Sequence, residues 1–153
     1  MATLEERIQL IEDRQALQDL LTAYCTAVDS LTDLEGLLDC FTDDAVFDLS
    51  GIDLPRFEGR EQIRGFFIPV FKDMSHHAHF NTNLAIDRLD GNESACRAYV
   101  MGMGATHDGR SVLVYVRYHL QCVRTTTGWK MRHFSEASLM PLPDSLTEIH
   151  GRD

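Results

Sequence analysis

The sequence predicts a single α+β domain, in which a curved, largely antiparallel sheet wraps around a long N-terminal helix. Apolar residues in the first third recur at helical spacing, whereas those of the second half alternate as they do in strands. Three glycine-containing turn signals separate the later segments in the manner of hairpins: Asp90-Gly91, Asp108-Gly109 and Thr127-Gly128. The 153 residues contain no Pro/Gly/Ser-rich linker, so one domain is expected over residues 1–153.

The N-terminal segment is expected to form one long helix that ends near Asp29-Ser30. Thr3 and Glu6 have the spacing of a capping box, in which each residue satisfies a free N–H group of the first turn. One face of the segment then carries an apolar stripe at helical intervals, formed by Leu10, Leu17, Leu21, Tyr24 and Val28.

A short helix and a strand are expected next. A second capping box, at Thr32 and Glu35, indicates the start of the helix, which continues to about Phe41. Asp43-Asp44 is typical of a turn, and residues 45–49 alternate as a strand.

A loop over residues 51–59 is expected to lead into a third helix near Gly59, whose apolar side consists of Ile63, Phe66, Phe67, Val70 and Phe71. Four strands follow, at about residues 78–88, 94–106, 111–124 and 128–139. A curved sheet around the first helix would leave a cavity between them. On the third of these strands one side is apolar, and the other is mixed: Leu113, Tyr115, Arg117, His119 and Gln121. The mixed side either lines the pocket or forms an outer face in an oligomer interface.

The composition limits the partners of this protein. The formal net charge is −10 and the pI is about 5.0, which disfavours binding to nucleic acid or to anionic membranes. No segment approaches the roughly 18 consecutive apolar residues of a membrane span, and the N-terminus is acidic and amphipathic, unlike a signal peptide. The four cysteines form no C-x-x-C pair, which is typical of reduced core thiols. A cytoplasmic protein is therefore expected.

Asp29 and a group of histidines are the candidate chemical residues. Asp29 follows an apolar run, so it is either a helix-end residue or a carboxylate directed into the interior. His77 and His79 alternate onto one face of an extended segment, and His76 lies on the other. A position on the protein surface is expected for both His76 and His77. A carboxylate bonded to one imidazole nitrogen raises the basicity of the other, which would provide a general base near neutral pH. Tyr24 is either a core tyrosine or a hydrogen-bond donor to a substrate.

The sequence predicts no cofactor and no metal. A metal site needs at least three ligands, and the sequence contains neither H-x-x-x-H nor H-E-x-x-H. It also lacks the G-x-G-x-x-G and Walker motifs of nucleotide-binding loops and the G-x-S-x-G motif of serine hydrolases.

Six stretches, taken in order, resemble the SnoaL-like family of the nuclear transport factor 2-like superfamily. They are residues 11–21, Tyr24 to Asp29, Phe41 to Phe47, Gly59-Arg60, His79 to Asn83 and Gly128 to Lys130. The resemblance covers nearly the whole chain and implies a cone-shaped α+β barrel with a deep apolar pocket. In the lyase members of this family, a helix-end aspartate and a histidine before a Thr-Asn strand form a catalytic dyad, and Asp29 and His79 match those positions.

The resemblance also implies further site residues and a function. Tyr24 matches a catalytic tyrosine five residues before the aspartate, and the substrate-binding residues are expected to be Phe47, Val100, Gly102, Tyr115 and His119. The expected function is a cofactor-free, dehydratase-like lyase acting on a small apolar cyclic molecule. The alternatives are an isomerase or polyketide cyclase using the same pocket, or a non-catalytic ligand-binding or assembly subunit. A homodimer or homotrimer is expected, because the open sheet has an outer face to cover. The tail, Pro141 to Asp153, either closes the pocket or extends freely.

Overall fold

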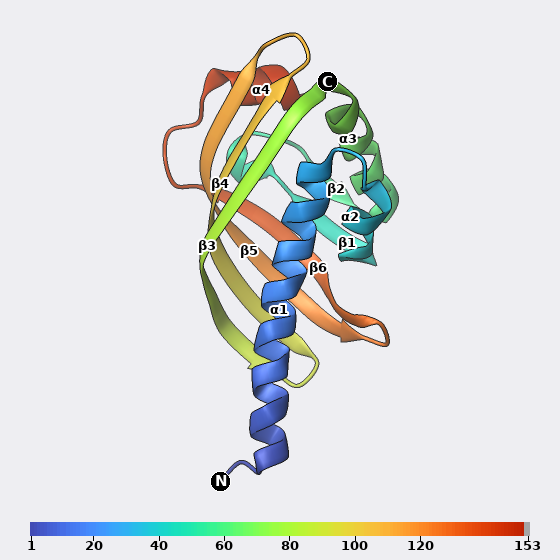
Figure 1. The fold of residues 1–153 in the computed structure, drawn as a ribbon, viewed down its shortest axis with the longest axis vertical. Helices are drawn as coiled ribbons and strands as arrows, with labels where there is room; N and C mark the ends of the chain where they lie inside the picture. Colours follow the sequence, from blue (N-terminus) through green and yellow to red (C-terminus); the bar gives the residue numbers. More distant parts are fainter. Residues whose placement is uncertain (152–153) are drawn as a thin grey trace.

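The computed structural model describes residues 1–151, and it confirms the α+β class. A long helix lies against one face of a six-stranded curved sheet (Figure 1), whose strand order is β2-β1-β6-β5-β4-β3. Neighbouring strands are antiparallel except β1 and β6, which are parallel, so the sheet is mixed. The elements in chain order are α1 (Leu4–Ser30), α2 (Leu34–Asp39), β1 (Phe41–Asp48), the 3-10 helix η1 (Ser50–Ile52), β2 (Arg56–Glu58), α3 (Arg60–Asp73), β3 (Met74–Asp90), β4 (Glu93–Thr106), β5 (Ser111–Thr125), β6 (Gly128–Ser138) and α4 (Asp144–His150).

Helix α1 begins and ends as the sequence predicts. The Glu6 side chain accepts a hydrogen bond from the backbone N–H of Thr3 at 2.7 Å, and the Thr3 hydroxyl accepts one from the N–H of Glu6 at 3.1 Å. The helix ends at Ser30, because Leu31 takes the left-handed conformation with φ 57°. Its first turns extend beyond the sheet and are exposed, whereas its second half is buried (Figure 1). Only this second half can therefore position pocket residues.

A partly buried ion pair fastens the middle of α1 to the sheet. The carboxylate of Asp13 accepts hydrogen bonds from the Arg124 guanidinium at 2.8 and 2.7 Å and from the Trp129 indole at 3.2 Å. The hydrogen bonds from Arg124 hold the pKa of Asp13 below its usual value, despite the opposing effect of burial. Since Arg124 lies on β5 and Trp129 on β6, this contact sets the position of α1 across two strands.

The segment between α1 and α3 differs from the prediction. Asp33, not Thr32, caps α2, since its carboxylate accepts the backbone N–H of Gly36 at 2.9 Å. Phe41 already begins β1, and Asp43-Asp44 lies inside that strand, where the pairing with β6 shifts register. The prediction of a turn was wrong because a bulge in a strand and a turn favour the same residues. The expected loop holds the short strand β2.

The C-terminal tail forms a helix that the sequence did not predict. Helix α4 packs against β5 and buries Leu146 and Ile149. The described part of the tail therefore covers the sheet rather than extending freely, while Arg152 and Asp153 lie outside the described residues. Strand β3 also begins at Met74, about four residues earlier than expected.

Two further expectations concern the cysteines and membrane segments. All four cysteines are buried and unpaired, as small core residues would be. Across residues 1–151, no helix combines the length and the apolar character that crossing a membrane requires.

Candidate active site

Asp29 and His79 form a hydrogen-bonded pair at the end of α1. The Nδ1–H of His79 donates to Asp29 Oδ1 at 2.5 Å, and the backbone N–H of His79 donates to Oδ2 at 2.9 Å. Both carboxylate oxygens of Asp29 are thus bonded to His79, although the two residues are 50 positions apart in the sequence. The side chains are 27% and 16% exposed, so neither is freely solvated. The structure therefore brings together the two residues that were predicted to form a pair.

The Asp29 carboxylate fixes the tautomer of the His79 imidazole. Burial alone would raise the pKa of Asp29, but the hydrogen bonds and charge of His79 outweigh burial, and the pKa lies below its usual value. A carboxylate only accepts hydrogen bonds, so whenever the His79 ring is neutral its one ring proton sits on Nδ1. Nε2 is then left unprotonated, and no group within residues 1–151 donates a hydrogen bond to it. This nitrogen has the properties of a general base.

Gly102 explains how the His79 ring fits against the sheet. The two residues are register partners on β4 and β3. A Cβ atom on residue 102 would lie 3.3 Å from both Cδ2 and Nε2 of His79, and 3.4 Å from the side chain of Val114. The absence of a side chain at this position allows the imidazole to lie close to β4, with its reactive nitrogen at the pocket wall.

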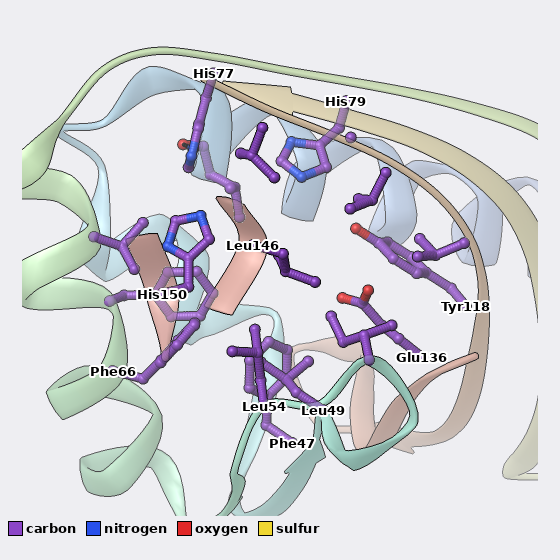
Figure 2. Close-up of a pocket in the computed structure, with 18 of the residues that line it drawn as sticks. Phe47, Leu49, Leu54, Phe66, His77, His79, Tyr118, Glu136, Leu146 and His150 are labelled. Carbon is purple, nitrogen blue, oxygen red and sulfur yellow. Dashed lines mark hydrogen bonds between the residues drawn. The ribbon is translucent and has the colours of Figure 1, made fainter. Parts of the chain in front are cut away.

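The pair opens on a pocket between the sheet, α3 and α4 (Figure 2). Most of its wall is apolar, including Phe47 from β1, Phe66 and Phe67 from α3, and Leu146 from α4. The polar side chains of the wall are Tyr24, His77, His79, Tyr118, Glu136 and His150. Such an apolar cavity with a few convergent polar groups is the usual form of a small-molecule site.

Tyr24 lines this pocket but is otherwise enclosed by aromatic rings. It is only 3% exposed and contacts Phe41, Tyr118 and Phe134 through ring centroids 5.3 to 6.2 Å apart. Burial raises its pKa well above 10, so the hydroxyl remains protonated at neutral pH. Tyr24 can therefore donate a hydrogen bond into the pocket.

The predicted substrate-binding residues divide into three groups. Phe47 and Gly102 line the pocket, as expected. Val100 is buried at 2% exposure but is not part of the wall. Tyr115 and His119 are exposed on the opposite face of β5, so their expected place in the pocket was wrong.

The alternation of β5 is the reason for that correction. The apolar set of this strand faces the cavity, through Val112, Val114, Val116 and Tyr118. Residues of a strand point alternately to opposite faces, so the mixed set must face outwards. Of the two readings that the sequence left open, the outer face is therefore the observed one.

The expected surface position of His77 was also wrong, because this residue lines the pocket. Its Nδ1–H donates to the backbone carbonyl of Val28 at 3.3 Å. Burial and the nearby His79 lower its pKa, so it stays neutral at neutral pH. His76, on the other face of β3, is exposed as expected.

Three pocket residues were missed by the sequence reasoning. Tyr118 was assigned to an apolar strand face but not to the site. Glu136 occupies the same face of β6 as buried residues, and an isolated acid on such a face was a usable signal. His150 belongs to α4, which had no clear sequence signal; burial lowers its pKa to about 4, with a smaller contribution from His77 and His79.

The polar groups of the pocket do not form a recognisable metal centre. Over the part of the chain that the structure describes, no three His, Cys, Asp or Glu side chains are arranged to hold an ion.

The comparisons with known proteins identify the family and the fold of this chain. The SnoaL-like domain family matches residues 9–135. A putative aromatic ring hydroxylase from Novosphingobium aromaticivorans has a crystal structure with 51% sequence identity and a TM-score of 0.85, covering 87% of this chain and 93% of that one. Among curated proteins, no match is found.

Two more distant structures share the fold. A putative scytalone dehydratase from Novosphingobium aromaticivorans DSM 12444 is 20% identical with a TM-score of 0.77, covering 86% of this chain and 87% of that one. An NTF2-like protein from Novosphingobium aromaticivorans is 20% identical with a TM-score of 0.75, and 97% of each chain is covered. The fold is thus NTF2-like, as expected, and because the family match spans most of the sequence, this chain belongs to the SnoaL-like domain family.

Proposed function

We propose that this protein is a cofactor-free lyase of the dehydratase type, with Asp29 and His79 as its catalytic pair. The observation that carries the proposal is the Asp29–His79 hydrogen bond at the wall of an apolar pocket. A structural role alone would not require the free nitrogen of His79 to face a cavity. General acid–base groups placed in this way each contribute roughly 10²–10⁴-fold to a rate.

In the proposed reaction, Nε2 of His79 removes a proton from a carbon atom that a neighbouring carbonyl group has made acidic. Asp29 holds the ring in position and stabilises the imidazolium ion that forms. Tyr24 donates a hydrogen bond to the carbonyl oxygen or to the departing group, since its hydroxyl stays protonated. Expulsion of the leaving group from the adjacent carbon then forms the double bond.

The pocket supports a small, mostly apolar cyclic substrate. Aromatic side chains from β1 and α3 form much of the wall, and flat rings pack well against such surfaces. The structure with 51% identity is described as a putative aromatic ring hydroxylase, and a more distant one as a putative scytalone dehydratase. The first description concerns an aromatic ring, and the proposal takes from it only this class of ligand.

An isomerase or polyketide cyclase would use the same proton transfer, with a different fate for the carbanion.

The homodimer or homotrimer expected from the sequence stays a prediction. The outer face of β3 to β5 exposes Phe80, Tyr99, Leu113 and Tyr115, which is consistent with self-association. A measurement of molecular mass in solution tests it.

The function is tested with a panel of cyclic β-hydroxy ketones, in which loss of water gives a conjugated product that absorbs in the ultraviolet. Turnover by the wild-type protein is expected to fall roughly 10²–10⁴-fold in His79→Ala. Tyr115→Ala, on the outer face, is the control and is expected to keep its rate. Turnover that is the same in His79→Ala as in the wild type would rule out the proposed base. If the wild type binds these rings but converts none, the non-catalytic subunit becomes the better description.

A further inference from the structure

Glu136 enters the pocket from the side opposite His79 (Figure 2). It is the direct register partner of Tyr118 on β5, so the two side chains leave the sheet on the same face. Figure 2 shows its carboxyl group pointing into the cavity, near the hydroxyl end of Tyr118. A ring bound in the pocket would therefore have His79 on one side and Glu136 on the other.

Glu136 has no partner within residues 1–151. No hydrogen bond or ion pair involves its carboxyl group, and the pocket wall contains no lysine or arginine. The titratable groups of the pocket wall besides Glu136 are Tyr24 from α1, His77 and His79 from β3, Tyr118 from β5 and His150 from α4. Cys25 and Asp29 of α1 are not part of the wall, although the charge of Glu136 acts on Cys25 and Asp29 is bonded to His79. An unpaired carboxylate in such surroundings is costly, and burial raises the pKa of Glu136 to about 8. At neutral pH the group is mostly a neutral carboxylic acid.

We propose that Glu136 is the acid partner of His79, and that it donates its proton to an oxygen of the substrate. This proposal rests on the proposed function, because it assigns the second proton transfer of the same elimination. His79 Nε2 takes the proton from carbon, the electron pair of that C–H bond forms the C=C bond, and the C–O bond breaks. The carboxyl proton of Glu136 moves to the departing oxygen, which leaves as water. Solvent then removes the proton from His79 and returns one to Glu136, so the protein is unchanged overall.

The placement of Glu136 also restricts the substrate class. The molecule must carry a hydroxyl or carbonyl oxygen on the side of the ring that faces β6, away from the C–H bond that faces His79. A hydrocarbon ring would leave the carboxyl group without a partner. The site is therefore expected to prefer an oxygenated ring over its hydrocarbon analogue of the same size, because an unpaired buried polar group weakens binding.

The test compares the binding of two probes, 1-tetralone and tetralin, by calorimetric titration. The ketone only accepts hydrogen bonds, and tetralin has the same bicyclic skeleton without oxygen. At pH 6 the wild type is expected to favour 1-tetralone, and Glu136→Leu to reduce that preference roughly threefold to tenfold. The matched control is Glu136→Gln, whose amide still donates but does not titrate. It is expected to keep the preference at pH 6 and at pH 10, whereas the wild type loses it by pH 10.

These outcomes distinguish a failure of the Glu136 proposal from a failure of the proposed Asp29–His79 dyad. Histidines in the pocket can also change binding with pH, but they are present in Glu136→Gln, so only the difference between this variant and the wild type reports on Glu136. An equal ketone preference in wild type and Glu136→Leu overturns the proposal, as does a wild-type preference that persists at pH 10. Neither result depends on turnover, and His79→Ala is expected to retain the Glu136-dependent preference even if the dyad has no catalytic role.

Discussion

Replacing Asp29 with asparagine should change which nitrogen of His79 carries the proton. The backbone N–H of His79 needs an acceptor, which Oδ2 of Asp29 now provides at 2.9 Å. In Asp29→Asn the amide oxygen is expected to take this role, and the amide nitrogen then faces Nδ1. That nitrogen is a donor, so Nδ1 must accept, and the ring proton moves to Nε2. The nitrogen that faces the pocket would no longer act as a base.

Two magnitudes follow from this geometry. Activity should fall roughly 10²–10⁴-fold, the usual contribution of a general base. Stability should fall by about 2 kcal/mol, because two hydrogen bonds to a charged group, each worth about 1.5–3 kcal/mol, become neutral bonds worth about 0.5–1.5 kcal/mol. Both side chains are less than one-third exposed, so solvent screens this contribution only in part.

Nitrogen NMR of histidine-labelled protein identifies the tautomer directly, and urea denaturation at pH 7 measures the stability. Asp13→Asn is a suitable control, since Asp13 is another buried acid of α1 that lies away from the pocket. It should lower stability without moving the proton of His79. A proton that stays on Nδ1 in Asp29→Asn, with catalysis unchanged, would refute the reasoning.

The other predictions concern the ion pair of Asp13, the glycine beside His79 and the outer face of β5. Asp13→Ala should cost about 3 kcal/mol in urea denaturation at pH 7, because it removes the carboxylate that pairs with the partly buried Arg124 and accepts the indole N–H of Trp129. The folded pKa of Asp13 is lowered, so its stabilisation is present above the unfolded pKa of about 3.9 and is lost as pH falls through the folded value. The gap between wild type and Asp13→Ala should therefore narrow on acidification, and a constant gap would contradict this account. Gly102→Ala should reduce turnover roughly tenfold by displacing the His79 ring, while Gly65→Ala, where a Cβ meets nothing within 4 Å, should not. His119→Ala should leave ligand binding unchanged in titration, as an outward-facing residue must.

Asp29 and His79, the proposed catalytic pair, could be picked out as candidates because their signals are local. An aspartate that ends a capped, apolar helix and a histidine that enters a strand both have clear patterns around them. The resemblance to known lyases then joined two residues that are 50 positions apart, which no periodicity could do. The place of Tyr24 on the apolar stripe of α1 favoured a core tyrosine, and its expected role in the site came from the resemblance.

The rest of the site depended on the phase of the strands and on the tail. Tyr115 and His119 were misplaced because the residues of β5 left both faces open and the resemblance placed the mixed face in the pocket, whereas this cavity is mostly apolar. Glu136 alternates with buried Phe134, but it was missed because a register shift near Gln121 on β5 interrupts the alternation of β6, so that buried Trp129 and Met131 indicate the opposite phase. His150 belongs to a seven-residue helix whose position depends on packing against β5, and local sequence carries little of that information.

The central claim is that Nε2 of His79 removes a proton from a carbon atom in the pocket. Exchange of the α-protons of 1-tetralone in D₂O tests it without a leaving group, and proton NMR follows the exchange. The wild type should accelerate the exchange, and His79→Ala should lose roughly 10²–10⁴-fold of that acceleration while remaining folded. The same acceleration in folded His79→Ala as in the wild type would contradict the account.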